Sequence, residues 1–130
     1  MSYDIYLCEP SRAAEYGSDD VSSRDIVVKL PEKHGCNGGT YMLGGTDDAW
    51  LNVTYNYGKI YYRVFGERGI RTIYGKTGAE SIPLLKGAIE QLGTDVHEDY
   101  WAATEGNARK ALTHLLSFAE ARPDGIWMGD

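Results

Sequence analysis

The sequence predicts an α+β fold, in which an antiparallel sheet of about four to five strands carries two C-terminal helices packed on one face. Three observations support this prediction: apolar residues alternate in the first half of the chain, they recur at helical spacing in the second half, and no internal repeat is present. The length of 130 residues fits a single domain, 1–130. Hydrophobic residues make up 42% and charged residues 25%, close to globular averages, which excludes a disordered or fibrous chain.

The N-terminal third contains two predicted strands joined by a polar loop. Residues 3–9 alternate between apolar and polar side chains, the period of a strand with one buried face. A second strand is expected over 25–30, and Pro31 should end it because proline has no backbone donor for a ladder. The glycine-rich stretch 34–45 predicts turns around a short strand at 40–43.

The alternation is clearest over residues 48–57, which we expect to form a strand with aliphatic and tyrosine side chains on one face. A tight turn at 58–59 would then lead into a further strand at 60–65, forming a hairpin. The opposite face would carry a row of amides and a hydroxyl, which is either simply solvated or able to read the donors and acceptors of a ligand. This row consists of Asn52, Thr54 and Asn56.

Helical spacing begins after a short run at 69–74, which is either a final strand or one helical turn. Thr77 and Glu80 match a capping box and predict a helix over 79–92, with Ser81 as the alternative cap. Pro83 should then lie in the first turn or so, where a missing N–H is tolerated.

The clearest helix is predicted from Thr104 or Glu105 to Arg122, where apolar residues form one continuous stripe. His114 lies opposite most of this stripe, so we expect it to be solvated. A turn should follow at 123–125 and allow the apolar residues 126–128 to pack back onto the domain.

The overall charge excludes some classes of protein. The chain carries 13 Lys and Arg against 19 Asp and Glu, a net charge of -6, which argues against a protein that coats double-stranded nucleic acid. No apolar run reaches the ~18 residues of a membrane span, and the N-terminus lacks the pattern of a secretory signal. We therefore expect a cytoplasmic protein in which Cys8 and Cys36 are reduced thiols.

Positive charge is concentrated in one stretch of the sequence. Residues 59–76 hold five basic residues and one acid, a balance of +4, whereas the rest of the chain has 8 basic and 18 acidic residues, a balance of -10. Such a cluster, interleaved with tyrosines that stack on bases, is typical of an anion or nucleotide site. The alternative is an ordinary surface of weak ion pairs and half-buried strand tyrosines. The candidate ligand-binding residues are Asn52, Thr54, Asn56, Lys59, Arg63, Arg68, Arg71, Tyr74 and Lys76.

Catalytic and metal-binding patterns are weak. The run Gly75–Thr77 ends like a phosphate-binding loop, but Ile70 stands where the required glycine would be, which leaves only a single anion contact at Lys76. His34 and Cys36 lie two residues apart with no second closely spaced ligand pair, so no metal is expected. No nucleophile elbow is present, and we assign no catalytic residue and no cofactor.

Three segments, GGTYMLGGTDDAWLNVTYNY, GIRTIYGKTGAESIPLL and RPDGIWMGD, together resemble a family of small uncharacterised proteins carried by bacteriophages and prophages. The resemblance covers most of residues 34–130. No activity is established for that family, so it supplies no functional residue. It implies a phage or mobile-element origin and action in the bacterial host cytoplasm, where small phage proteins often bind and disable host-defence components.

Three functions are therefore considered. The first is a non-enzymatic phage accessory protein that binds and neutralises a host factor or an anionic, nucleotide-like ligand, as a host-defence antagonist. The second is a small enzyme acting on a nucleotide or phosphorylated substrate, with Glu67 or Glu80 as the acid beside Lys76. The third is an acidic protein-only inhibitor that mimics nucleic acid. Each is compatible with an oligomer.

Overall fold

The computed structural model of the chain describes residues 2–17, 19–34 and 45–130. Cys36 and the short strand expected at 40–43 lie outside these described residues, whereas Cys8 is a buried free thiol.

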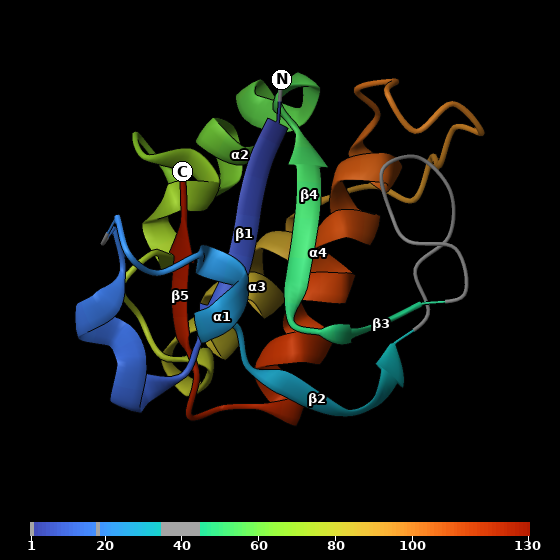
Figure 1. The fold of residues 1–130 in the computed structure, drawn as a ribbon. Helices are drawn as coiled ribbons and strands as arrows, with labels where there is room; N and C mark the ends of the chain where they lie inside the picture. Colours follow the sequence, from blue (N-terminus) through green and yellow to red (C-terminus); the bar gives the residue numbers. More distant parts are fainter. Residues whose placement is uncertain (1, 18, 35–44) are drawn as a thin grey trace.

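A three-stranded antiparallel sheet lies at the centre of the molecule, in the order β4-β1-β5 (Figure 1). Its strands are β1 (Ser2–Cys8), β4 (Trp50–Thr54) and β5 (Ile126–Gly129). A second antiparallel sheet pairs β2 (Lys29–His34) with β3 (Thr46–Asp48). The fold is thus α+β, but the described residues form sheets of three and two strands instead of one sheet of four or five.

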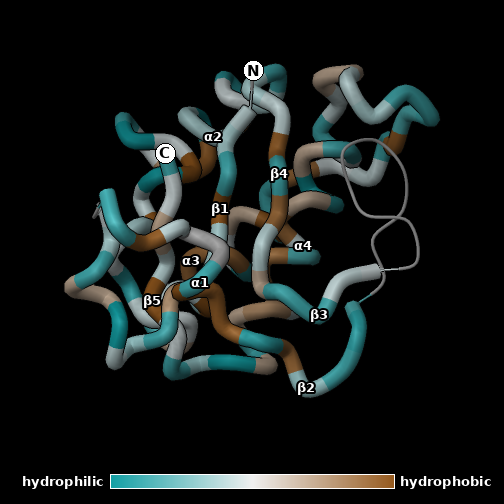
Figure 2. The backbone as a smooth tube through the Cα atoms, viewed as in Figure 1, coloured by the Kyte–Doolittle hydropathy of each residue, from teal (hydrophilic) through white to brown (hydrophobic). Residues whose placement is uncertain are grey.

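Helices α3 (Gly78–Gln91) and α4 (Glu105–Ala121) lie behind the three-stranded sheet in Figure 1. Figure 2 shows hydrophobic positions recurring along β1, β4 and β5, where the core lies. On β1 the odd-numbered residues Ile5 and Leu7 are fully buried, and the indole of Trp127 on β5 donates a 2.7 Å hydrogen bond to Ser81 of α3. The helices therefore cover one face of the sheet.

The N-terminal connection crosses part of the opposite face. It consists of the 3-10 helix η1 (Pro10–Glu15) and the short helix α1 (Ser23–Ile26), which lies in front of the sheet in Figure 1. The strand predicted over 25–30 is wrong, because α1 occupies its first residues and β2 starts only at Lys29. Pro31 does not end β2: the ladder to β3 is irregular between its two end pairs, so no donor is required there.

The hairpin predicted after β4 is also wrong. The chain leaves β4 through the 3-10 helix η2 (Tyr55–Tyr57) and forms helix α2 (Gly58–Phe65) in place of the strand expected at 60–65. Tyr57 and Tyr61, four residues apart, are both fully buried with ring centroids 6.1 Å apart. Packing at this helical spacing overrides the strand preference of aromatic residues.

The predicted helices are confirmed to within about two residues. Thr77 and Glu80 form the capping box, each side chain accepting a hydrogen bond from the other residue's backbone N–H. Ser81 is not the cap, and Pro83 lies deeper in α3 than the first turn. The run at 69–74 forms the 3-10 helix η3 (Gly69–Ile73), and the tail packs back as strand β5.

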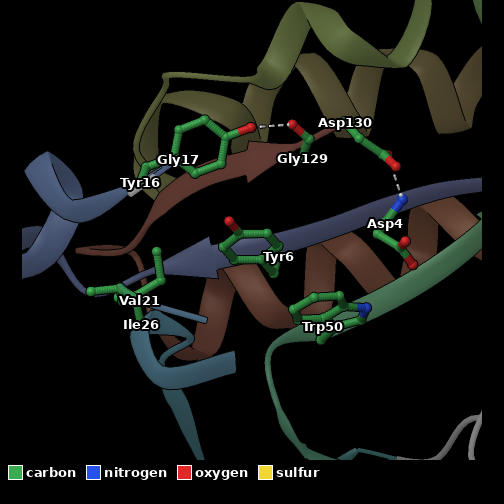
Figure 3. Close-up of a pocket in the computed structure, with 9 residues that line it drawn as sticks. All are labelled: Asp4, Tyr6, Tyr16, Gly17, Val21, Ile26, Trp50, Gly129 and Asp130. Atoms are coloured by element: carbon green, nitrogen blue, oxygen red, sulfur yellow. Dashed lines mark hydrogen bonds between the residues drawn. The ribbon is translucent and has the colours of Figure 1, made fainter. Parts of the chain in front are cut away.

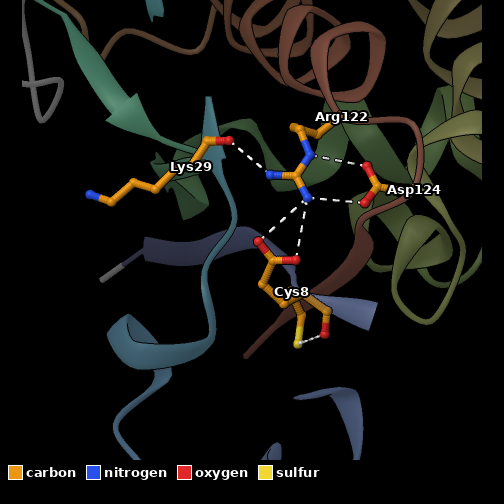
Figure 4. A network of polar contacts seen from close by, with 5 residues as sticks. Cys8, Lys29, Arg122 and Asp124 are labelled. Atoms are coloured by element: carbon orange, nitrogen blue, oxygen red, sulfur yellow. Dashed lines mark hydrogen bonds and ion pairs between the residues drawn. The ribbon is translucent and has the colours of Figure 1, made fainter. Parts of the chain in front are cut away.

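Arg122, at the end of α4, joins three parts of the chain (Figure 4). Its guanidinium donates to the main-chain oxygen of Lys29 at 2.9 Å and to the carboxylate of Asp124 at 3.0 Å, and contacts Glu9 at 3.3 Å. These three contacts of Arg122 connect the end of β1, the start of β2 and the turn before β5. None of the described helices is long and apolar enough to cross a bilayer.

Candidate functional site

A pocket of about 350 Å³ opens on the sheet face that α3 and α4 leave uncovered (Figure 3). Its floor comes from the three strands, with Asp4 and Tyr6 of β1, Trp50 of β4, and Gly129 and Asp130 at the end of β5. The N-terminal connection supplies the remaining described wall through Tyr16, Gly17, Val21 and Ile26.

The strand register explains why these side chains meet. Even-numbered residues of β1 point away from the helices, and Tyr6 is paired with Trp50 on one side and with Met128 on the other. The rings of Tyr6 and Trp50 are stacked, with centroids 4.8 Å apart and planes 11° apart. Such a cross-strand aromatic pair makes a rigid apolar floor.

Two carboxylates lie at the polar end of the pocket. Asp4 accepts a 2.7 Å hydrogen bond from the amide of Asn52, its partner on β4. The side chain of Asp130 accepts a 2.9 Å hydrogen bond from the backbone N–H of Asp4. The hydroxyl of Tyr16 donates to the main-chain oxygen of Gly129 at 2.6 Å and so ties the N-terminal connection to β5. The described lining contains these two acids and no Lys, Arg or His.

The hydroxyl of Tyr6 neither donates nor accepts a hydrogen bond within the described part of the chain. Tyr6 is 3% exposed, and no hydrogen-bond partner for its hydroxyl exists among the residues that the structure describes. Burial raises the pKa of Tyr6 far above its usual value, and Tyr16 and Asp130 act in the same direction. The group is therefore a neutral, buried phenol. The hydroxyl of Tyr74, which packs against Gly129 outside the pocket lining, is likewise buried without a hydrogen-bond partner among the described residues.

The polar row predicted on one sheet face does not act as a unit. Asn52 faces the pocket side but donates to Asp4 and, at 2.6 Å, to Ser2. Thr54 is 1% exposed and accepts a hydrogen bond from the backbone N–H of Asn56, capping η2. Asn56 in turn donates to the main-chain oxygen of Trp101 at 2.9 Å, beyond the end of the strand.

The predicted cations extend over several elements. Arg63 of α2 forms a 3.1 Å ion pair with Glu105 at the start of α4. Arg71 of η3 instead donates through Nε to the main-chain oxygen of Asp130 at 2.8 Å, and its guanidinium lies 4.8 Å from the ring centroid of Tyr3. The structure therefore directs these two guanidiniums toward different elements.

The other predicted members lie apart from both. Lys59 and Arg68 are exposed and have no ion pair within the described part of the chain, and the backbone of Lys76 pairs with Trp127. The backbone N–H of Tyr74 donates to the main-chain oxygen of Arg71 at 3.0 Å, and the Tyr74 hydroxyl lies against Gly129, where burial raises its pKa. Of the predicted cations, Arg71 lies beside the pocket, because its Nε donates to the main-chain oxygen of the lining residue Asp130.

His34 and Ser117 are in contact, as a catalytic base and a nucleophile would be. His34 Nδ1 lies 2.9 Å from Ser117 Oγ, and that hydroxyl donates its only proton to the main-chain oxygen of His114 at 2.7 Å. Nδ1 must then donate to Oγ, so this imidazole cannot remove the serine proton. His114 is not solvated as expected: it is partly buried, and burial together with Lys110 lowers its pKa. The described residues contain no group of three potential metal ligands.

Sequence reasoning missed the pocket residues Tyr6, Tyr16, Trp50 and Asp130. Their sequence positions are far apart, and the register of β1 against two distant strands brings them together. One signal was available: the face of β1 opposite its aliphatic residues carries Asp4 and Tyr6, an acid next to an aromatic ring on the same side of a strand.

Comparison of the chain with protein-family models, with curated proteins and with solved structures finds no match in any of the three. The resemblance to phage proteins stays a prediction from the sequence.

Proposed function

We propose that this protein is a non-enzymatic binding protein whose ligand site is the pocket on the open face of the β4-β1-β5 sheet. The observation that carries this proposal concerns Tyr6, a pocket residue that is 3% exposed and whose hydroxyl has no hydrogen-bond partner among the residues that the structure describes. An unsatisfied buried polar group costs roughly 1–3 kcal/mol. Such a cost is typical of functional sites, where a ligand supplies the missing partner.

The size and chemistry of the pocket support binding. A volume of about 350 Å³ suits a small molecule or one protruding side chain. The stacked rings of Tyr6 and Trp50 give it a preformed floor. The described lining offers no Ser, Cys, His or Lys side chain as a nucleophile or neutral-pH base, which favours binding over catalysis.

A second candidate function, binding of an anionic ligand at Arg71, is favoured by one observation. Only Nε of this guanidinium has a hydrogen-bond partner among the described residues, while the group is held over the ring of Tyr3. Its two Nη atoms can therefore donate to a phosphate or carboxylate. A host factor as the partner, and a phage origin, remain predictions from the sequence.

A nuclear magnetic resonance titration of the ¹⁵N-labelled full chain tests both candidates. The probes are butylammonium, pentan-1-ol, butanoate and adenosine monophosphate, each added to millimolar concentration. At least one probe is expected to shift the indole N–H of Trp50 and the amide of Gly129 in a saturable manner. If no probe moves these signals, the pocket proposal is wrong. If adenosine monophosphate shifts only the signals of Arg71, the second candidate, anion binding at Arg71, is supported. If a probe is converted to a product, the protein is an enzyme.

A further inference from the structure

We infer that the pocket receives an organic ammonium group, with the carboxylates of Asp4 and Asp130 as its counter-ions. This inference rests on the proposed function and names the chemical class of its ligand. The ammonium belongs either to a free small amine or to a lysine side chain of a partner protein, because both present the same headgroup on an alkyl chain.

The charge of the lining selects a cation. Asp4 and Asp130 are the charged side chains of the described lining, and no basic side chain of that lining offsets them. Arg71, the cation in contact with Asp130, donates its Nε to the main-chain oxygen. A cation entering the pocket gains from both carboxylates, whereas an anion is repelled by them.

Each carboxylate keeps one oxygen for a ligand. Asp4 uses Oδ1 to accept from Asn52, and Asp130 uses Oδ1 to accept from the backbone of Asp4. No hydrogen bond to either Oδ2 is present among the described residues. An ionised carboxylate only accepts and an ammonium only donates, so the two groups are complementary. The oxygen of Tyr6 provides a further acceptor in the same lining.

The rest of the lining suits an alkyl body. The stacked rings of Trp50 and Tyr6 line the pocket and give methylene groups an apolar surface (Figure 3). Val21 and Ile26 provide an apolar wall for methylene groups. A primary ammonium should bind more tightly than a quaternary one, because only the former has N–H groups to donate to the carboxylates and to Tyr6.

The affinities of matched probes, measured by the same titration of the full chain, test the inference. Butylammonium is expected to bind at least about tenfold more tightly than its neutral isostere pentan-1-ol, and more tightly than butyltrimethylammonium. Its affinity should fall as sodium chloride is added, while that of pentan-1-ol should not. A peptide amide containing one lysine separates the two sources: tighter binding than butylammonium indicates a partner side chain, and weaker binding indicates a free amine.

Isosteric variants locate the charge effect. Asp4→Asn and Asp130→Asn should each weaken butylammonium binding about tenfold and leave pentan-1-ol binding unchanged. Glu90→Gln makes the same charge change at an exposed position of α3 and should have no effect. The salt dependence of the unmodified protein gives an independent result if either variant does not fold.

Two results would overturn the inference: butylammonium binding no tighter than pentan-1-ol, or Glu90→Gln weakening it as much as the two aspartate variants. If pentan-1-ol or butanoate shifts the pocket signals and butylammonium does not, the ligand class is wrong while the binding function holds. If no probe shifts the pocket signals, both the ligand class and the proposed binding function are wrong.

Discussion

Replacing Tyr6 by phenylalanine should stabilise the ligand-free protein, although it removes an atom from a well-packed aromatic pair. The ring can keep its position, stacked 4.8 Å from Trp50, because only the hydroxyl is lost. That hydroxyl is buried without a partner among the described residues, so its desolvation cost of roughly 1–3 kcal/mol disappears in the variant. We expect a gain of about 1 kcal/mol in the free energy of unfolding, or about 4 °C in melting temperature for a chain of this size.

Urea unfolding followed by circular dichroism measures this change, provided that the slope with denaturant is unchanged. Tyr61→Phe is the matched control: Tyr61 is equally buried, but its hydroxyl donates a 2.9 Å hydrogen bond to the main-chain oxygen of Ala108. This variant should lose about 1 kcal/mol. If Tyr6→Phe destabilises the protein as much as Tyr61→Phe does, the Tyr6 hydroxyl is already satisfied and the reasoning is refuted.

Three further changes are expected to lower stability, each measured by urea unfolding. Gly129→Ala should cost about 1–3 kcal/mol, because a Cβ there would collide with the ring of Tyr74 and lie 2.7 Å from the main-chain oxygen of Asp4; an unchanged midpoint would contradict this packing. Arg122→Ala should cost about 1–2 kcal/mol. Arg122 lowers the pKa of Asp124 in the folded protein. The stability gained from this pair is therefore present above the unfolded pKa of about 4 and is lost as the pH falls through the lower folded pKa. The free energy of unfolding of the Arg122→Ala variant should accordingly fall less steeply toward acid pH than that of the unmodified protein. Thr77→Ala removes the N-cap of α3 and should lower the free energy of unfolding by about 1 kcal/mol. The control variant Thr94→Ala, in an exposed connector, should leave the free energy of unfolding unchanged.

The elements that the sequence predicted well are those encoded by local signals. The capping box at Thr77 and the apolar stripe after Thr104 fix α3 and α4, and the alternation at the N-terminus fixes β1. The strand predicted at 60–65 is wrong because tyrosine, isoleucine and valine favour strands only where packing does not decide the conformation. The conformation of these residues follows from tertiary packing: Tyr57 and Tyr61 are fully buried one helical turn apart, and the hydroxyl of Tyr61 donates to the main-chain oxygen of Ala108 on α4.

The candidate site could not be derived in the same way. Charges that cluster along the chain do not cluster in space when the elements between them diverge, as Arg63 and Arg71 show by contacting α4 and the end of β5. The pocket depends on strand register between residues as far apart as Asp4 and Asp130. One sequence specifies this register only through the packing of the whole domain.

A high-resolution crystal structure of the protein with butylammonium tests the central claim most directly. We predict density for the amine in the pocket, with its nitrogen between the carboxylates of Asp4 and Asp130 and about 3 Å from the hydroxyl oxygen of Tyr6. A pocket that holds only water at saturating amine, or an amine bound solely to acids elsewhere on the surface, would contradict the account.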